Sequence, residues 1–104
     1  MELTVYWTEF AEDKLEDVFS YFIEKVSLRF AQQLVDEIID RSLELATNPL
    51  MGQKEILLAD RIQDFRYLVY KNYKIIYWLN IKRNRIEIVN LFDCRQNPQK
   101  MNEI

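Results

Sequence analysis

The sequence predicts an α+β fold of order β-α-α-β-β-β, in which a helical hairpin packs on an antiparallel sheet. After one short alternating stretch, segments with helical periodicity fill the first half of the chain, whereas aromatic and β-branched residues dominate the second half. Strands that gather after helices are typical of α+β proteins. With 104 residues, one glycine and two prolines, the chain has room for one core and almost no linker. We therefore expect a single domain over residues 1–104.

The first element is a half-buried strand at residues 2–7. Leu3, Val5 and Trp7 alternate there with more polar side chains, and a period of two is the pattern of a strand that buries one face. We expect this strand to join the sheet at an edge.

Two helices come next. Thr8 is a good N-cap residue, and the acidic residues just after it suit the first turn of a helix. Apolar residues spaced three and four apart then continue as far as Val26. Ser27 can cap a second helix, which should end near Thr47 because the residue before Pro49 is pushed out of the α region. The short break between the helices predicts a helical hairpin.

The connection at residues 49–64 is the least regular part of the sequence. We expect Gly52 to take a turn, and residues 56–59 to form either a short strand or a buried segment. Three strands should follow at residues 65–70, 73–81 and 86–92, separated by turns at Lys71-Asn72 and 82–85. A two-residue turn fits a β-hairpin, and we expect Asn72 to tolerate positive φ.

The register of this hairpin follows from its turn. Pairing across a two-residue turn sets Val69 opposite Lys74 and Arg66 opposite Tyr77. In a regular register, Arg66 and Lys74 then lie on opposite faces of the sheet, which does not favour one site containing both. A bulge or a longer turn would change this arrangement.

The composition excludes several kinds of chemistry. The chain has no histidine, one cysteine and no glycine-rich phosphate loop, so it lacks the residues of histidine-based catalysis and cysteine-rich zinc sites. We expect no metal and no cofactor. Cys94 has no histidine to lower its pKa, and the carboxylates of the helices read as solvated surface. The N-terminus lacks the pattern of a secretory signal, and no apolar stretch approaches ~20 residues, so we expect a cytoplasmic protein without membrane spans.

Charge is divided unevenly along the chain. Residues 1–60 carry 5 basic and 13 acidic side chains, whereas residues 61–104 carry 9 basic and 4 acidic ones. This asymmetry indicates either a basic working surface or strands that merely carry cations on their wet face. The cations of the second half are Arg61, Arg66, Lys71, Lys74, Lys82, Arg83, Arg85, Arg95 and Lys100. Neighbouring tyrosines suit either base stacking or an ordinary core.

Several segments, taken in order, resemble the RelE/ParE superfamily of bacterial type II toxin-antitoxin toxins. They are WTEFAEDKLEDVFSYF (7–22), LATNPLMGQ (45–53), FRYLVYKNYKIIYWL (65–79) and VNLFDCRQNP (89–98). The resemblance covers nearly the whole chain and is poorest at residues 52–64. It implies a small toxin that a cognate antitoxin protein neutralises. RelE-like members cut mRNA on the ribosome, whereas ParE-like members bind DNA gyrase and block replication.

The resemblance also indicates which residues to consider. Lys74 stands where the family commonly has an arginine on a central strand, Arg95 stands where an arginine closes the last strand, and Arg66 matches a basic residue of the preceding strand. A RelE-like nuclease is expected to have a tyrosine a few residues after that last arginine, where this chain has Met101. Since the chain also lacks histidine, acid-base chemistry has few candidates, which favours the ParE-like interpretation.

Two main hypotheses result. In the first, the protein poisons gyrase by binding it, and the contact residues come from segment 92–104 and from a set of cations: Arg95, Lys74, Arg83 and Lys100. In the second, it is a ribosome-dependent mRNA endonuclease, in which Lys74 acts as base or electrostatic clamp and Arg66 and Arg95 hold the scissile phosphate. A third hypothesis is a family member that has lost toxicity and acts as a binding partner.

Overall fold

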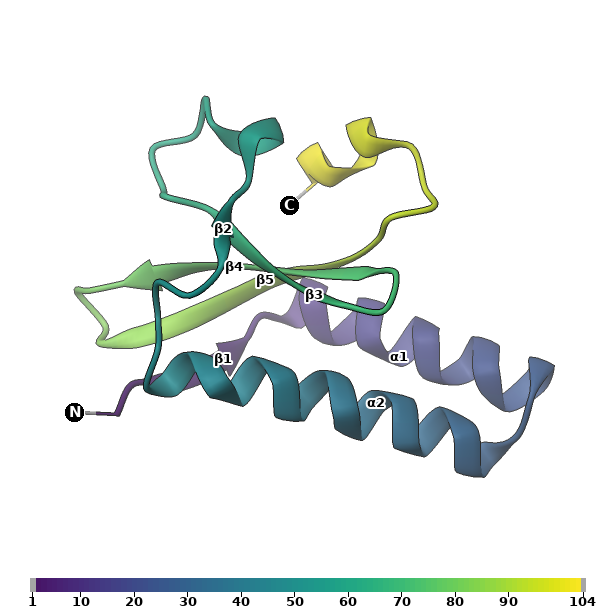
Figure 1. Ribbon diagram of the computed structural model, residues 1–104. Coiled ribbons are helices and arrows are strands. Elements are labelled where there is room, and N and C mark those ends of the chain that lie inside the picture. The colour runs from purple at the N-terminus through teal and green to yellow at the C-terminus, as the bar shows by residue number, and fades with distance from the viewer. Residues whose placement is uncertain (1, 104) are drawn as a thin grey trace.

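The computed structural model describes residues 2–103 and contains a helical hairpin that covers one face of a five-stranded sheet (Figure 1). The helices are α1 (Glu9–Lys25) and α2 (Leu28–Leu43). The strands are β1 (Thr4–Trp7), β2 (Gln53–Lys54), β3 (Arg66–Tyr70), β4 (Tyr73–Asn80) and β5 (Arg85–Asp93), in the spatial order β1-β5-β4-β3-β2. Three 3-10 turns complete the fold: η1 (Glu44–Ala46), η2 (Ile56–Leu58) and η3 (Pro98–Glu103). The predicted α+β class and helical hairpin are confirmed.

Both helix starts were predicted correctly. Thr8 Oγ1 accepts a hydrogen bond of 3.2 Å from the Ala11 N–H, and Ser27 Oγ accepts one of 3.1 Å from the Phe30 N–H. Each bond satisfies one of the backbone donors that a helix leaves unpaired in its first turn. The second helix continues through η1 to Ala46, next to the predicted end.

The first strand lies at the edge, as expected, but it runs parallel to its neighbour β5, with Val5 paired to Ile86. The sheet is therefore mixed at this edge and antiparallel elsewhere. The chain leaves β1 through two helices, so no tight turn fixes the relative direction of the two strands. The pairing ends at Ile88, whose carbonyl accepts a 3.0 Å hydrogen bond from the Thr8 N–H.

The connection before β3 differs from the prediction. Residues 53–54 form β2, which pairs with β3 and was not predicted. Residues 56–59, expected as a strand or buried segment, contain the η2 turn instead, in which Leu58 is buried but Ile56 is 82% exposed. A two-residue edge strand is too short for any alternation of polarity to show in the sequence.

The predicted register of the β3–β4 hairpin is confirmed, since Val69 pairs with Lys74 and Arg66 with Tyr77. The positive φ falls on Lys71, at 54°, and not on Asn72. A bulge lies farther along, where Ile76 pairs with Asn90 but the next residue of β4 pairs with Ile88. The bulge lies in the pairing of β4 with β5, so it does not alter which faces the hairpin residues take.

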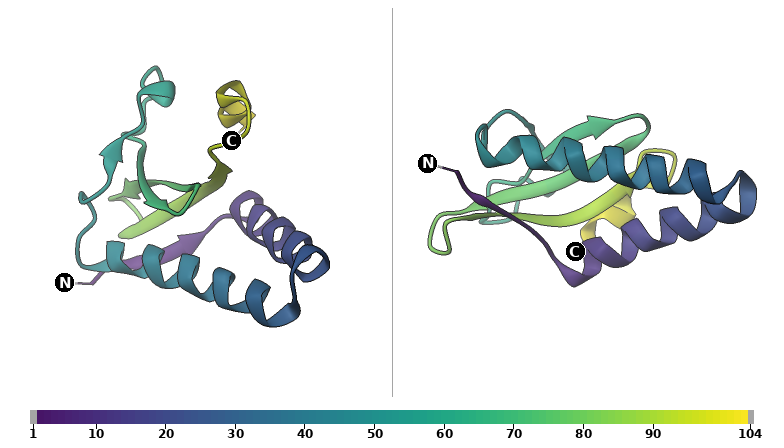
Figure 2. Two further views of the ribbon diagram at one scale, coloured as in Figure 1. Left: turned by 45° about the vertical axis from the view of Figure 1, so that its right-hand side comes forward. Right: turned by 90° about the horizontal axis from the view of Figure 1, so that it is seen from below.

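Apolar side chains are buried on both faces of the sheet. Figure 2 shows the two helices on one face and the C-terminal segment on the other. On the helix side, residues from α1 and α2 pack against Ile75, Tyr77, Ile86 and Ile88. On the other side, η2 and η3 cover a smaller cluster made by Leu58, Phe65, Ile76, Phe92 and Met101. This second cluster places the C-terminal segment and the 52–64 connection on the same face of the sheet.

Candidate functional site

Arg95 lies two residues beyond the end of β5 and forms an ion pair with Asp93. Its Nε and Nη2 donate to the two carboxylate oxygens at 3.0 and 2.8 Å, and its backbone N–H donates to Oδ1 at 2.9 Å. The side-chain hydrogen bond from Arg95 lowers the pKa of Asp93, and the same bond raises the pKa of Arg95. The guanidinium stays 63% exposed, so it is fixed in direction but open to a partner.

A groove of about 340 Å³ opens beside this ion pair, between α1 and the end of the sheet. We call it the Arg95 groove. Its lining consists of Lys14, Asp17, Val18, Tyr21, Tyr73, Leu91, Asp93, Arg95 and Gln96. Burial raises the pKa of Tyr73, with a further contribution from Asp93, so this phenol is a poor base at neutral pH. The groove mixes cations, carboxylates and aromatic surface, which suits binding of a protein surface better than proton transfer.

Lys74 lies on the opposite face of the sheet, where Glu55 holds it. Its ammonium is 2.8 Å from Glu55 Oε2 and 4.2 Å from the centre of the Tyr67 ring. The Glu55 side chain is only 3% exposed, and its other oxygen accepts the Leu57 N–H at 3.2 Å. Because a buried carboxylate needs its cation, Lys74 is committed to this pair.

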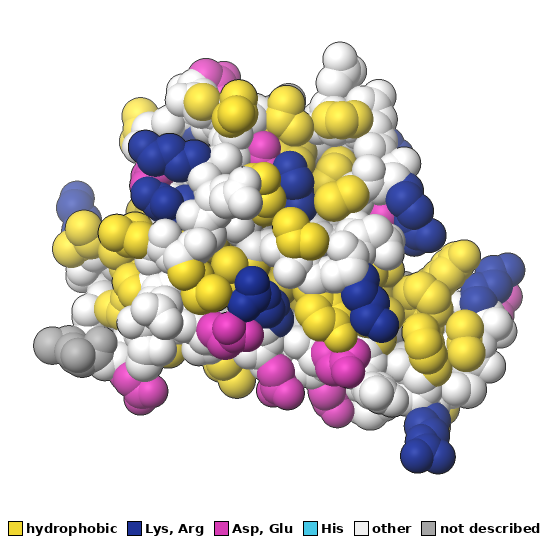
Figure 3. Space-filling view, viewed as in Figure 1, with side chains coloured by type: hydrophobic (Ala, Val, Ile, Leu, Met, Phe, Trp, Pro, Cys, Tyr) yellow, Lys and Arg dark blue, Asp and Glu magenta, His cyan; other side chains and the backbone are white. Residues whose placement is uncertain are grey.

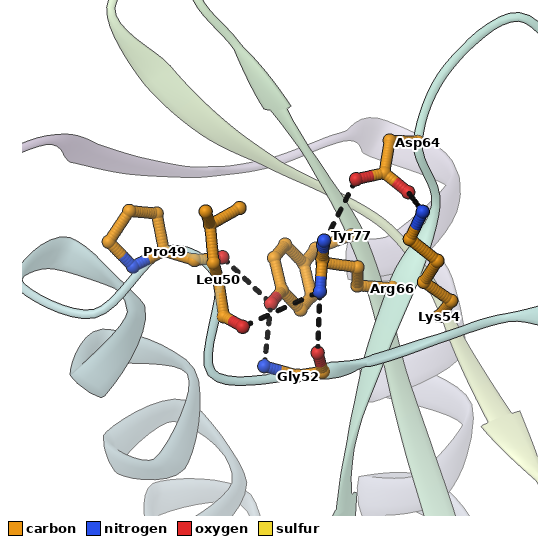
Figure 4. Close-up of polar contacts among 7 residues, drawn as sticks. All are labelled: Pro49, Leu50, Gly52, Lys54, Asp64, Arg66 and Tyr77. Atoms are coloured by element: carbon orange, nitrogen blue, oxygen red, sulfur yellow. Dashed lines mark hydrogen bonds and ion pairs between the residues drawn. The ribbon is translucent and has the colours of Figure 1, made fainter.

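Arg66 stabilises the loop before β2 (Figure 4). Its Nε lies 3.1 Å from Asp64, and its Nη1 donates to the Gly52 carbonyl at 3.0 Å and, more weakly, to the Leu50 carbonyl at 3.5 Å. Under it, the hydroxyl of Tyr77 accepts the Gly52 N–H at 3.0 Å and donates to the Pro49 carbonyl at 2.8 Å. The guanidinium therefore satisfies backbone carbonyls of a loop, which is a structural role.

Arg83 and Lys100 lie at opposite ends of the last strand. Arg83 is exposed in the turn before β5, where its N–H donates to Asn80 Oδ1. Lys100 is exposed on η3, and it lines a small cavity together with Lys14 and Gln96, two residues of the Arg95 groove. Because β5 is nine residues long, Arg83 and Arg95 are separated by roughly 30 Å. Only Lys100 therefore belongs to the same region as Arg95.

The structure does not bring the three expected nuclease residues together. Arg66 faces the helix side with its paired residue Tyr77, Lys74 faces the side of η2 and η3, and Arg95 projects past the end of β5. Each of the three forms an ion pair with an acidic residue of the chain. The sheet separates Lys74 from Arg66 and from the Arg95 groove, so the three cations cannot converge on one phosphate.

Sequence reasoning missed Lys14 and the acidic partners of the cations. Only the carboxylates of the helix surfaces were considered from the sequence, and Lys14 was not singled out, although it is the one cation among the many acids of the first α1 turns. That isolation is the signal that could have singled it out. Glu55 gave no such signal, because its pairing with Lys74 joins residues that lie 19 apart in the chain.

Met101, which stands where the resemblance would place a tyrosine, is buried. Its side chain is 1% exposed and packs against Phe92, Ile76 and Leu58. This contact holds η3 on the sheet. The residue therefore has a packing role, and its thioether supplies no group for proton transfer.

The comparisons with known proteins identify the family. The family model described as "ParE toxin of type II toxin-antitoxin system, parDE" matches residues 5–98. The chain belongs to the ParE toxin family. The region matched includes both helices and all of the strands except the first residue of β1.

A solved structure supports the ParE fold. A chain of the "Chromosomal ParDE TA system from P. aeruginosa" superposes with a TM-score of 0.73 at 14% sequence identity. The match covers 88% of this chain and 96% of the other. Because the two sequences are only 14% identical, this similarity shows a shared fold and carries no conclusion about function. No curated protein sequence gives a significant match.

Within residues 2–103, which are the part of the chain that the structure describes, no helix is long and apolar enough to cross a membrane. The same part of the chain contains no group of three or more Cys, Asp or Glu side chains arranged to hold a metal ion.

Proposed function

We propose that this ParE-family protein is a growth inhibitor that acts by binding DNA gyrase. The observation that carries the proposal is the match of residues 5–98 to the ParE toxin family model. The distribution of the cations supports it, because a contact surface tolerates cations on separate faces, whereas a phosphate-cleaving site requires them to converge on one atom.

The proposed contact surface is the end of β5 and the segment after it, as far as the described residues go. Arg95 is its central residue, since its guanidinium is exposed and oriented by Asp93, and Lys100 lies nearby on η3. Arginine residues fixed in this way are frequent anchors of protein interfaces. Lys74 and Arg83, also proposed as contacts, lie apart from this surface and would take part only in a much larger interface.

A cognate antitoxin is the second proposed partner. A cytoplasmic location is part of the same proposal, since gyrase acts on DNA inside the cell. In Figure 3 several acidic side chains lie along the lower edge of the molecule, whereas most of the cations are scattered above them. Basic antitoxin segments would suit the acidic face, and acidic segments would suit the sheet. Copurification of the toxin with the product of a neighbouring small gene tests this partner directly.

The gyrase proposal is tested with purified protein in a supercoiling and DNA-cleavage assay. We expect inhibition at micromolar concentration and a clear loss of inhibition in Arg95→Ala. Arg29→Ala, which removes an exposed arginine from the hairpin end of α2, is the matched control and should inhibit like the parent protein. Gyrase that works normally with the parent protein present would refute the proposal.

The nuclease alternative has its own measurement. Mapping of transcript 5′ ends after induction should reveal no new cuts in translated codons if gyrase is the target. New cuts that disappear in Lys74→Ala would instead identify an mRNA endonuclease. Induction without any growth arrest, in a host lacking the antitoxin gene, would indicate a family member that has lost toxicity.

A further inference from the structure

A second, smaller cavity lies where β5 continues beyond the end of β1. The pairing of β1 stops at Ile88, so the outer edge of the last β5 residues faces α1 and the C-terminal segment. The cavity there has a volume of about 110 Å³. We call it the lysine cavity, and its lining consists of Lys14, Asn90, Leu91, Phe92, Gln96 and Lys100. A single water needs about 10–15 Å³, so there is room for several waters or one tetrahedral ion.

The lining of this cavity carries positive charge only. It includes two ammonium groups and two carboxamides but no carboxylate, in contrast with the neighbouring Arg95 groove, which includes Asp17 and Asp93. Among the side chains described for residues 2–101, neither Lys14 nor Lys100 has an ion-pair partner. Like charges that share one cavity repel each other, and a bound anion would remove this repulsion.

Asn90 supplies an independent indication of a ligand. The residue is 2% exposed, and its Oδ1 is the buried side-chain oxygen that lacks a hydrogen-bond partner among the described residues. Buried polar atoms are nearly always paired with protein or with a bound molecule such as water, so an unpaired acceptor beside a polar cavity marks a place where a hydrogen-bond donor can bind. A fully deprotonated anion has no hydrogen to donate to this oxygen.

We propose that the lysine cavity binds a phosphate group that carries a proton. The two ammonium groups and the Gln96 amide donate to its unprotonated oxygens, and its P–OH donates to Asn90 Oδ1. Inorganic phosphate keeps such a proton at neutral pH, whereas sulfate has none, so the site discriminates between two ions of similar shape and charge. This inference shares Lys100 and the segment after β5 with the proposed gyrase contact surface. It rests on other observations, namely the cavity and the unpaired Asn90 oxygen, and does not depend on gyrase binding.

The binding test uses inorganic phosphate and the full chain. Amide NMR spectra are recorded at pH 7 and constant ionic strength while phosphate or sulfate replaces chloride. We expect saturable shifts of the Asn90 and Gln96 side-chain amides with phosphate, and binding of sulfate that is about tenfold weaker because one hydrogen bond is missing. No saturable shift, or equal binding of the two ions, overturns the proposal.

Variants locate the site. Lys14→Gln and Lys100→Gln should each weaken phosphate binding about tenfold. The matched control is Lys82→Gln, which changes an exposed lysine in the turn at the far end of β5 and should leave binding unaltered. If the control weakens binding as much as Lys14→Gln does, the effect is one of net charge and the proposed site is wrong.

Asn90→Leu tests the role of the proton donor. This variant should bind phosphate and sulfate equally, because the acceptor that distinguishes them is gone. Persistent preference for phosphate would contradict the assignment, and the lysine variants remain informative if Asn90→Leu does not fold. A dinucleotide with a 5′-phosphate, tested at pH 5.5 where the monoester is largely protonated (pKa about 6), then distinguishes a phosphate monoester from free phosphate as the natural ligand.

Discussion

At the residue scale, Gly52 is a position at which only glycine fits. The residue does not take a positive φ, so the turn expected from the sequence is not the reason for glycine. A Cβ built at this position would lie 2.6 Å from the Tyr77 hydroxyl and 2.8 Å from the Tyr67 carbonyl oxygen. The close approach lets the Gly52 N–H reach the hydroxyl and the carbonyl reach Arg66.

Gly52→Ala should therefore lower the free energy of unfolding by about 1–3 kcal/mol, as overpacking of a tight site does. Urea denaturation followed by fluorescence measures this change. Removing the hydroxyl in the double variant with Tyr77→Phe should not restore stability, because the Tyr67 carbonyl is backbone and cannot move away. A Gly52→Ala protein as stable as the parent would contradict this account.

Asp93 gives a pH-dependent prediction at the same scale. Its pKa is lowered from the ordinary 3.8 in the folded protein, chiefly by the hydrogen bond from Arg95. The stability that the Asp93 carboxylate contributes is fully present above its ordinary pKa. This contribution is lost as the pH falls through the lowered pKa of the folded protein. The Asp93→Asn variant should lose less stability than the parent between neutral pH and acidic pH below 3.8. Denaturation curves at a series of pH values measure the difference, and parallel pH profiles would refute it.

At the scale of elements, a buried side chain holds the C-terminal segment on the sheet. Met101 packs into the cluster that also contains Leu58 and Phe92, and among the side chains that the structure describes it is the sole member of that cluster from η3. The proposed contact surface and the lysine cavity both involve this segment. Its docking on the sheet therefore decides how Lys100 is presented.

Met101→Ala should loosen the C-terminal segment without unfolding the rest. Truncation of a buried methionine costs about 2–5 kcal/mol in a protein core, which is enough to release a short terminal segment. Hydrogen exchange followed by mass spectrometry should become faster in residues 94–103 and stay unchanged in α1 and α2. Met51→Ala, at a site that is 41% exposed, is the control and should have little effect. Faster exchange throughout the chain would instead indicate global destabilisation.

At the scale of the whole molecule, the cations divide into structural and exposed groups. Arg66 and Lys74 have side chains only 18% and 22% exposed, and both bind other parts of the chain, whereas Arg95 is 63% exposed. Some of the cations in the basic second half of the sequence are therefore neutralised by ion pairs within the fold. Exposed arginines remain available for steering and contact with an anionic or acidic partner.

This division predicts opposite consequences for two arginine variants. Arg66→Met should lose stability, because the part-buried Gly52 carbonyl loses its donor, at a cost of about 1–3 kcal/mol for a group left unpaired. Arg95→Ala should change the melting temperature only slightly, because an ion pair whose arginine is 63% exposed contributes little stability, and it should lose growth arrest. Thermal denaturation and induction in a sensitive host measure the two properties. The prediction fails if Arg95→Ala melts well below the parent or if Arg66→Met does not.

The sequence by itself determined those features that depend on near neighbours. The caps at Thr8 and Ser27, the helical stripes and the register of the β3–β4 hairpin follow from residues a few positions apart, because periodicity and turn length act locally. The opposite faces of Arg66 and Lys74 followed from the same register. The family resemblance added the type of protein, which the match over residues 5–98 confirms.

Only the tertiary structure decided the features that depend on contacts between distant segments of the chain. The parallel direction of β1, the short β2 strand, the Glu55 partner of Lys74 and the burial of Met101 all arise from contacts between residues far apart in the chain. No local sequence pattern encodes these contacts, because they form between segments that meet only after the chain has folded over the two faces of the sheet. For the same reason, Lys14 joined Arg95 and Lys100 at the end of β5 only once α1 was packed against that strand.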